Sequence, residues 1–520
     1  MSQSKNAVKS VVIMVVFSLI SSLLGFLREA LIAAKFGAGI ESDAFFIALT
    51  ATTLLTLMIT KTINTTMIPV FSEIEVKEGK SGKIKHVNNF LNVVFIVSIV
   101  IILLGWIFAP VIIRLLAFGF QGSQFELAVL LMRIGLPAIF FAGTLGVLRG
   151  FLQSELKFIE SATTQLPFNL VYIFFLVFLA SIFGIKGLMI TSVLAVASQI
   201  LIQIPGVRKT GFKYRAVVDI KDKYFKKIAH LAPPVLLSVA VSDINQIVDK
   251  SLASTLVNGS VSALNYADRI KGLIQGIFIM AIATVIFPIL SKESNKENYE
   301  GFKRIMRYGI NIIVLISIPA TVGIIVLADP IVSIAFERGA FDSKAKYMTI
   351  GALIFYSLGL LGMALRTFLN KVYYSLSDTK TPMINGIIAV FFNIILNFIL
   401  VRFMAHEGLA LATSISATIT TGLLFYGLKK KIGYLGVTKY LICAVKSLFA
   451  SMIMAIVIYL IYYNLETTMV GNSLEHIALF LFSVGAGVFV YVIVIYILKV
   501  EELSWLINII KQKLKKGNSR

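Results

Sequence analysis

The chain is poor in the residues on which many soluble enzymes rely. Its 520 residues include one cysteine, two tryptophans and four histidines, and only 14% are charged, against about 25% in an average soluble domain. With Cys443 as the sole thiol, an intrachain disulfide and a cysteine metal site are excluded. The sequence contains no His/Cys/Asp spacing of a metal enzyme and no nucleotide loop of the GxxxxGK[ST] kind. These absences exclude the common metal-dependent and nucleotide-hydrolysing enzymes.

Hydrophobic runs dominate what is present. Hydrophobic residues make up 58% of the chain, and the mean hydropathy is +0.90. Stretches of about 20 apolar residues, long enough to cross a hydrocarbon core, recur from Val8 to Val500 with short polar breaks. We therefore predict an all-α polytopic membrane protein with about fourteen transmembrane helices and no large soluble domain. The predicted spans are 10–34, 44–70, 88–117, 128–150, 159–183, 187–206, 231–253, 261–290, 306–328, 348–374, 383–403, 407–428, 440–463 and 474–499.

Positive charge follows the predicted topology. Lys and Arg concentrate on the cytoplasmic side of membrane proteins, and here they gather in alternate connections, whereas 118–127 and 464–473 contain none. The basic connections include 77–85, 208–227, 292–307 and 429–439. The pattern predicts a multi-pass protein of the bacterial cytoplasmic membrane with both termini inside. It also explains the net charge of +22 by topology and by attraction to anionic membrane lipids, so we expect no nucleic acid partner.

The C-terminal tail, 501–520, has the pattern of a basic amphipathic helix. Its apolar side would consist of Trp505, Leu506, Ile509 and Ile510. We expect this helix to lie on the inner leaflet.

An internal repeat divides the chain. MIPVFSE, with Pro69, resembles IFPILSK, with Pro288, at an offset of 219. LGVLRGFL, with Arg149, resembles LGMALRTFL, with Arg366, at an offset of 217. The repeat predicts two six-helix lobes of equal orientation, an arrangement used for alternating access; the alternative is that Pro and Arg recur at helix ends in many membrane proteins. The predicted parts are an N-lobe at 1–210, a C-lobe at 225–430, a helix pair at 440–500 and the tail.

Ionisable residues occur within the predicted spans, where each costs about 2.5 to 3.5 kcal/mol at a helix centre. One interpretation is that Arg28 and Arg269, one from each half, converge on an anionic ligand, because guanidinium groups donate paired hydrogen bonds to phosphate. The other is that each arginine pairs with a local acid: Arg28 with Glu29 or Asp43, and Arg269 with Asp268 or Asp249. Both remain open. The intramembrane set is Arg28, Glu29, Asp43, Lys61, Asp243, Asp249, Asp268, Arg269 and Lys271.

Neighbouring residues on a helix point about 100° apart. If Arg28 faces a cavity, we therefore expect Glu29 to face another helix.

A second polar set is nearly uncharged. Asn393 and Asn397 share a helix face, Thr413 lies in the next span, and Asp249 adds an acid. Together they could ligate a small hard cation through oxygen. Alternatively, the asparagines join helices by hydrogen bonds.

Several motifs resemble the lipid II flippase (MurJ/MviN) family of the MOP exporter superfamily, in order and over nearly the whole chain. They are LLGFLREALIAAKFGAGIESDAFFIAL, VSALNYADRI, IFPILSK, FERGAFD and YSLSDTKTP. The resemblance implies two six-helix lobes, two further helices forming a groove for a polyprenyl tail, and export of an undecaprenyl-pyrophosphate-linked sugar-peptide to the outer leaflet for peptidoglycan synthesis. It places cavity arginines at Arg28 and Arg269, acids at Glu29 and Asp43, and a cation site at Asp249, Asn393, Asn397 and Thr413.

The resemblance has a gap in the second span. Where the family has an LLRR stretch, this chain reads TATTLLTLMITK, so Lys61 is the residue that would replace the missing charge. This leaves a flippase for another lipid-linked oligosaccharide, and a small-molecule antiporter of the same superfamily, as alternatives.

We expect a transporter rather than an enzyme, with no cofactor beyond coupling to a monovalent cation such as Na⁺ or to the membrane potential. The expected partners are a lipid-linked pyrophosphate oligosaccharide, anionic lipids and the cell-wall synthesis machinery. The expected substrate-binding residues are Arg28, Glu29, Asp43, Lys61, Asp268 and Arg269.

Overall fold

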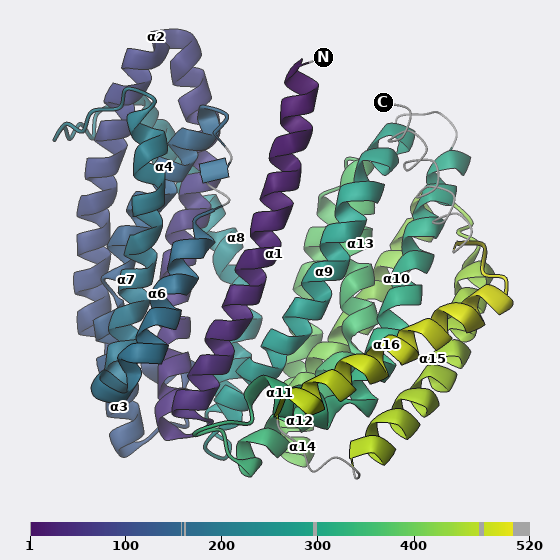
Figure 1. Ribbon diagram of the computed structural model, residues 1–520. Coiled ribbons are helices and arrows are strands. Elements are labelled where there is room, and N and C mark those ends of the chain that lie inside the picture. Colours follow the sequence, from purple (N-terminus) through teal and green to yellow (C-terminus); the bar gives the residue numbers. More distant parts are fainter. Residues whose placement is uncertain (1, 158, 161–162, 295–298, 467–472, 503–520) are drawn as a thin grey trace. The chain divides into compact units, whose positions relative to one another are not determined.

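Helices account for all the regular structure of the described residues (Figure 1), in agreement with the predicted fold class. The computed structural model describes residues 2–157, 159–160, 163–294, 299–466 and 473–502. The predicted amphipathic tail lies almost wholly outside these residues and stays a prediction. The helices are α1 (Ser2–Phe36), α2 (Ile40–Leu116), α3 (Gly122–Gly135), α4 (Ala138–Ser154), α6 (Gln165–Phe178), α7 (Ala180–Arg208), α8 (Lys223–Ala253), α9 (Ser260–Ser294), α10 (Glu300–Val326), α11 (Ala328–Phe336), α12 (Ser343–Leu358), α13 (Leu360–Ser375), α14 (Lys380–Ile432), α15 (Val437–Glu466) and α16 (Ser473–Ile497).

The chain divides into two compact units. The first consists of Met1–Asn265 and Arg338–Ala345, and the second of Tyr266–Glu337 and Lys346–Arg520. Arg28 therefore belongs to the first unit and Arg269 to the second. The lobe boundaries derived from the internal repeat stay a prediction.

Two long helices each contain a reversal. At about 1.5 Å per residue, the 77 residues of α2 would extend far beyond the roughly 30 Å of a hydrocarbon core. Gly79, with φ 69° and ψ −174°, interrupts the helix, and the Phe71 and Phe90 rings from its two arms lie 5.7 Å apart. The arms correspond to the predicted spans 44–70 and 88–117. Ala405, with φ 48°, divides α14 in the same way.

The predicted span 348–374 is bent rather than straight. It consists of α12 and α13, which meet at 45° around Gly359. A Cβ on Gly359 would lie 2.7 Å from the Cα of Ser414, so the bend brings α14 close to this point. By length and composition, eight of the described helices, or nine with this bent pair, suit a membrane crossing. The count of fourteen crossings stays a prediction.

Each unit has its own apolar core. In the first, the arms of α2 pack on α4 and α8 around Phe71, Phe90 and Phe151. In the second, α10 packs on α13 and α15 around Phe302 and Met454. Large apolar side chains also cover the exterior, which is typical of a surface that faces lipid.

Candidate functional site

Arg28 lies on α1 in a buried polar pocket against α6. Its side chain is 10% exposed, and Nη2 lies 2.7 Å from Oε1 of Glu29. Nη1 donates to Oδ1 of Asn169 at 3.3 Å. The guanidinium also lies over two rings, 5.4 Å from the centroid of Phe168 and 5.1 Å from that of Tyr172. Two acceptors and two aromatic faces therefore hold this cation in a fixed place.

Glu29 is one of the two local acids that the sequence offered as a partner of Arg28, and its pairing is compatible with a later contact between Arg28 and an anionic ligand. The local-acid interpretation is confirmed for this arginine, with Glu29 rather than Asp43 as the partner. The expectation that Glu29 faces another helix stays a prediction. Although the Cβ atoms of Arg28 and Glu29 diverge around the helix, the long arginine side chain spans the separation and its guanidinium reaches the carboxylate.

Asp43 has a different partner, the N-terminus of α9. Its Oδ2 accepts the Gly259 N–H at 2.7 Å, and its Oδ1 accepts the Ser262 N–H at 2.8 Å and the Ser262 hydroxyl at 2.5 Å. The side chain is buried. Asp43 thus caps α9 from another helix, satisfying backbone N–H groups that would otherwise have no partner.

Backbone segments meet directly beside this cap. The N–H of Ala340 donates to the carbonyl of Ala34 at 2.8 Å. Gly37 (φ +61°) lies against the carbonyl of Ala340, and Gly339 (φ +62°) against that of Ala34. A Cβ at either glycine would collide with the opposing carbonyl. We call this contact the glycine junction; it explains why 338–345 belongs to the first unit.

Lys61 and Asp243 form a loose ion pair between α2 and α8. Nζ lies 4.0 Å from Oδ1, and the side chains are 45% and 17% exposed. The charge expected to replace the missing arginine is therefore present in the second predicted span, opposite an acid.

In the second unit, Asp268 pairs with Lys271 on the same helix turn. Nζ of Lys271 lies 2.5 Å from Oδ1 of Asp268 and 4.3 Å from the centroid of Tyr356. Arg269, between them in sequence, is exposed on α9. Its substrate role stays a prediction.

The residues of the candidate cation site fall in both units. Asp249 is half-buried on α8 in the first unit. In the second, Asn397 Nδ2 donates to Asn393 Oδ1 at 3.0 Å, and Asn393 Nδ2 donates to Thr413 Oγ1 at 3.3 Å. Two hydrogen bonds thus link three uncharged side chains, and the cation site stays a prediction. Among the described residues, no group of three or more His, Cys, Asp or Glu could hold a metal ion.

A family model decides the identity. The model described as "Lipid II flippase MurJ" matches residues 32–512. The chain belongs to the MurJ family of lipid II flippases.

A MurJ relative and a solved MurJ structure support this assignment, and a second solved structure shares the fold. A protein named "Probable lipid II flippase MurJ" from Vibrio cholerae is 33% identical over 441 residues, covering 82% of this chain and 83% of the relative. A solved "Lipid II flippase MurJ, inward closed conformation" has a TM-score of 0.78 at 27% identity, covering 94% of this chain and 98% of that one. An inward-facing multidrug resistance MATE transporter of the MOP superfamily has a TM-score of 0.66 at 17% identity, covering 82% and 99%; it shows the fold alone. As a MurJ family member, the chain is an integral inner-membrane protein and a transporter by family.

The sequence did not reveal the residues that hold Arg28. Phe168, Asn169 and Tyr172 lie in an apolar stretch and carry no charge. Their spacing does place Phe168 and Tyr172 one helical turn apart on one face. A polar residue beside such an aromatic pair in a predicted span is the signal that could have found them.

A second set that the sequence did not reveal lies where the arms of α2 meet the segment before α8. Asn88 accepts the Arg215 N–H at 2.7 Å and donates to the Lys213 carbonyl at 3.0 Å. Asn92 donates to the Arg215 and Val217 carbonyls at 2.9 and 3.1 Å. With Asn89, these side chains form an asparagine ladder along 213–219 that fixes the connection between the sixth and seventh predicted spans.

Ion pairs reinforce the same region of the first unit. The imidazole of His86 lies between Glu78 and Asp222, with both N···O distances at 2.8 Å. Lys223 Nζ lies 2.9 Å from Glu78 Oε1. The hydrogen bonds from Lys223 and His86 lower the pKa of Glu78 to about 2. Because residues of two basic connections, 77–85 and 208–227, meet here, this end of the unit carries the charge expected on the cytoplasmic side.

Proposed function

We propose that this chain moves lipid II, an undecaprenyl-pyrophosphate-linked sugar-peptide, from the inner to the outer leaflet by alternating access, for peptidoglycan synthesis. The observation that carries the proposal is the MurJ family match across residues 32–512. The proposed orientation has both termini in the cytoplasm. The alternation of basic and charge-poor connections in the sequence supports that orientation.

Arg28 is the proposed pyrophosphate contact of the first half. It is a preorganised cation, with its guanidinium held by Glu29 and Asn169. A pyrophosphate would offer acceptors of higher charge than the single carboxylate of Glu29. Exchange of one anion for the other would then bind the headgroup without leaving a buried cation uncompensated.

Arg269 is the proposed contact of the second half. It is an exposed cation one residue from Asp268, whose carboxylate is already paired with Lys271. Lys61, opposite Asp243, is the proposed third cation, in place of the arginine that the family carries in this span. An ammonium contributes charge without the two-pronged geometry of a guanidinium.

The glycine junction and the Asp43 cap are the proposed closure on the outer side. On the proposed orientation, the loops around Gly37, Gly259 and Gly339 all face outward. Release of cargo to the outer leaflet would require the contacts between these loops to separate. Hydrogen bonds that are individually modest suit an element that opens and closes in each cycle.

The energy source is proposed to be the membrane potential, worth about 2.3 kcal/mol per charge per 100 mV. Ligation by Asn393, Asn397 and Thr413 alone would leave a cation without a negative partner. A Na⁺-coupled variant of the mechanism therefore depends on Asp249 as the acid.

A flippase for another lipid-linked oligosaccharide is the second candidate, favoured by one observation: the second span lacks the arginine of the family pattern, and Lys61 lies about one to two turns further along. Depletion of the protein in its native cell separates the two. Accumulation of lipid II on the inner leaflet supports the first proposal, and accumulation of a different lipid-linked precursor supports the second.

A reconstituted assay tests the arginines. In liposomes, Arg28→Ala and Arg269→Ala should abolish flipping of lipid II, and Arg28→Lys and Arg269→Lys should retain part of it. Lys429→Gln, which removes an exposed cation at the end of α14, is the control and should flip normally. Normal flipping by both alanine variants would remove the proposed phosphate role.

A further inference from the structure

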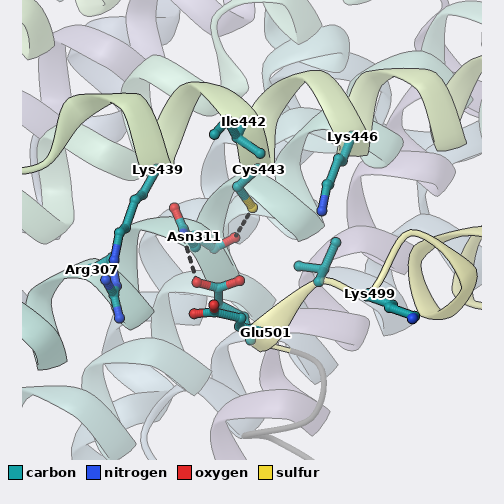
Figure 2. A pocket seen from close by; sticks show the side chains of 10 residues that line it. Arg307, Asn311, Lys439, Ile442, Cys443, Lys446, Lys499 and Glu501 are labelled. Carbon is teal, nitrogen blue, oxygen red and sulfur yellow. Dashed lines mark hydrogen bonds between the residues drawn. The ribbon is translucent and has the colours of Figure 1, made fainter.

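The second unit contains a cationic pocket apart from the residues described above. It is a cavity of about 240 Å³ between the first turns of α10, the first turns of α15 and the segment that follows α16. Figure 2 shows Arg307, Lys439, Lys446 and Lys499 around it, together with Asn311 and Glu501. None of these residues belongs to the proposed arginine site or to the candidate cation site.

The lining has an excess of positive charge. It carries four basic side chains and two acidic ones. One of the acids, Glu502, is buried and accepts a hydrogen bond from Asn311 Nδ2 at 2.6 Å. Lys446 donates to the Leu498 carbonyl at 2.7 Å, which fixes its ammonium at the wall of the pocket. The pocket therefore suits a ligand of net negative charge.

Buried polar atoms in the lining point to a ligand with both acceptors and donors. Arg307 Nε is a buried donor, and Asn311 Oδ1 a buried acceptor; neither has a hydrogen-bond partner within the described part of the chain. Buried groups of this kind are normally satisfied by protein, water or ligand. A phosphate oxygen would accept from Arg307, and a headgroup hydroxyl would donate to Asn311 or Glu501.

The surroundings of the pocket are apolar and exposed. Ile442, which lines it, is 50% exposed, and Leu441, Val445 and Phe449 continue along α15 with exposures of 59%, 66% and 57%. The i, i+4, i+8 spacing of Leu441, Val445 and Phe449 places these three side chains on one helix face. A ligand in the pocket therefore has an adjacent surface for acyl chains.

We propose that this pocket binds the phosphate headgroup of an anionic glycerophospholipid, of the phosphatidylglycerol type, with its acyl chains along α15. Basic pockets between transmembrane helices on the cytoplasmic side are suited to such headgroups. The volume is below the roughly 300 Å³ at which pockets for larger ligands begin. It is large enough for a phosphoglycerol group.

Native mass spectrometry of the delipidated full chain tests the proposal. Titration with phosphatidylglycerol should give one saturable site, and Arg307→Gln should weaken it about tenfold, since a charge-assisted contact is lost. Lys429→Gln removes an equal charge outside the pocket and should leave the affinity unchanged. Lys499→Gln, at an exposed position, takes over the test if Arg307→Gln fails to fold.

Two competitors identify the chemistry. Phosphatidylethanolamine, with no net charge, should displace phosphatidylglycerol only weakly, and inorganic pyrophosphate, with no acyl chain, should do the same. Equal competition by either overturns the proposal, as does equal weakening by Arg307→Gln and Lys429→Gln. Flipping activity enters none of these readouts, so they are independent of the proposed function.

Discussion

Asn89 uses both ends of its side-chain amide on one backbone residue. Oδ1 accepts the Asp219 N–H at 2.6 Å, and Nδ2 donates to the Asp219 carbonyl at 2.8 Å. This is the pairing that a neighbouring strand would make, supplied here by a side chain. It gives an extended segment without regular structure a defined register on the second arm of α2.

Loss of this pairing should loosen the connection before α8. We expect Asn89→Ala to reduce the free energy of unfolding by about 1–3 kcal/mol, because two backbone groups lose their partners. Tryptic cleavage after Lys213 and Arg215 should become faster. The exposed Asn258 provides the control, since Asn258→Ala should change neither quantity. Unchanged cleavage in Asn89→Ala would show that the ladder does not hold the segment.

Removal of the acid beside Arg28 should strengthen anion binding. Glu29→Gln leaves the guanidinium without its carboxylate, so a pyrophosphate no longer competes with that anion. We expect an undecaprenyl-pyrophosphate analogue to bind about tenfold more tightly, because one competing charge-assisted hydrogen bond is removed. Turnover in liposomes should become slower, because the tighter-bound ligand is released more slowly. Glu41→Gln, at an exposed acid of α2, should leave both unchanged. Weaker binding by Glu29→Gln would indicate that the carboxylate positions Arg28 instead of competing with the ligand.

Acid should weaken the end of the first unit that contains His86. The pKa of Glu78 lies at about 2 in the folded chain, below its ordinary value of 4.5, because Lys223 and His86 donate hydrogen bonds to it. A carboxyl group whose pKa is lowered in the folded chain stabilises the fold at any pH above its ordinary pKa. This stabilisation is lost as the pH falls through the pKa of the folded state. The midpoint of thermal unfolding should therefore fall between pH 4.5 and about 2, and Glu78→Gln should flatten this dependence. Glu126→Gln, an exposed acid elsewhere, should keep the wild-type profile.

Alanine in the glycine junction should be costly. Gly37→Ala adds a Cβ both in a left-handed conformation and against the Ala340 carbonyl, so we expect about 2–3 kcal/mol of destabilisation. Gly433 has φ +81° with open space around its Cβ position, and Gly433→Ala should lose only about 1 kcal/mol. Unfolding in mixed micelles with increasing SDS measures both. Equal losses would show that the backbone contact contributes nothing beyond the glycine conformation.

Hydropathy predicted the fold class because burial in lipid demands long apolar helices, and the predicted spans lie largely on helix in the described residues. The bend at Gly359 was not predicted, and it lies where Ser414 of another helix comes close. Composition along one segment carries no information on such a contact.

The site was predicted in part. The ion pair of Arg28 was among the alternatives because Glu29 is its neighbour in sequence. The cap that Asp43 makes on α9 was not, because it joins residues more than two hundred positions apart. Asn169 and Asn89 carry no charge and match no motif, so only the packed structure identifies them.

The glycine junction joins two motifs that the sequence presents about three hundred residues apart. Gly37 follows the LREALIAAKF stretch and Gly339 lies in FERGAFD, yet each faces the other segment's backbone. A substitution at Gly37 or at Gly339 therefore affects both positions, because a side chain at one of them displaces the loop that carries the other. Among homologues of this chain, the two positions should covary: both should retain glycine, or both should change in the same lineages.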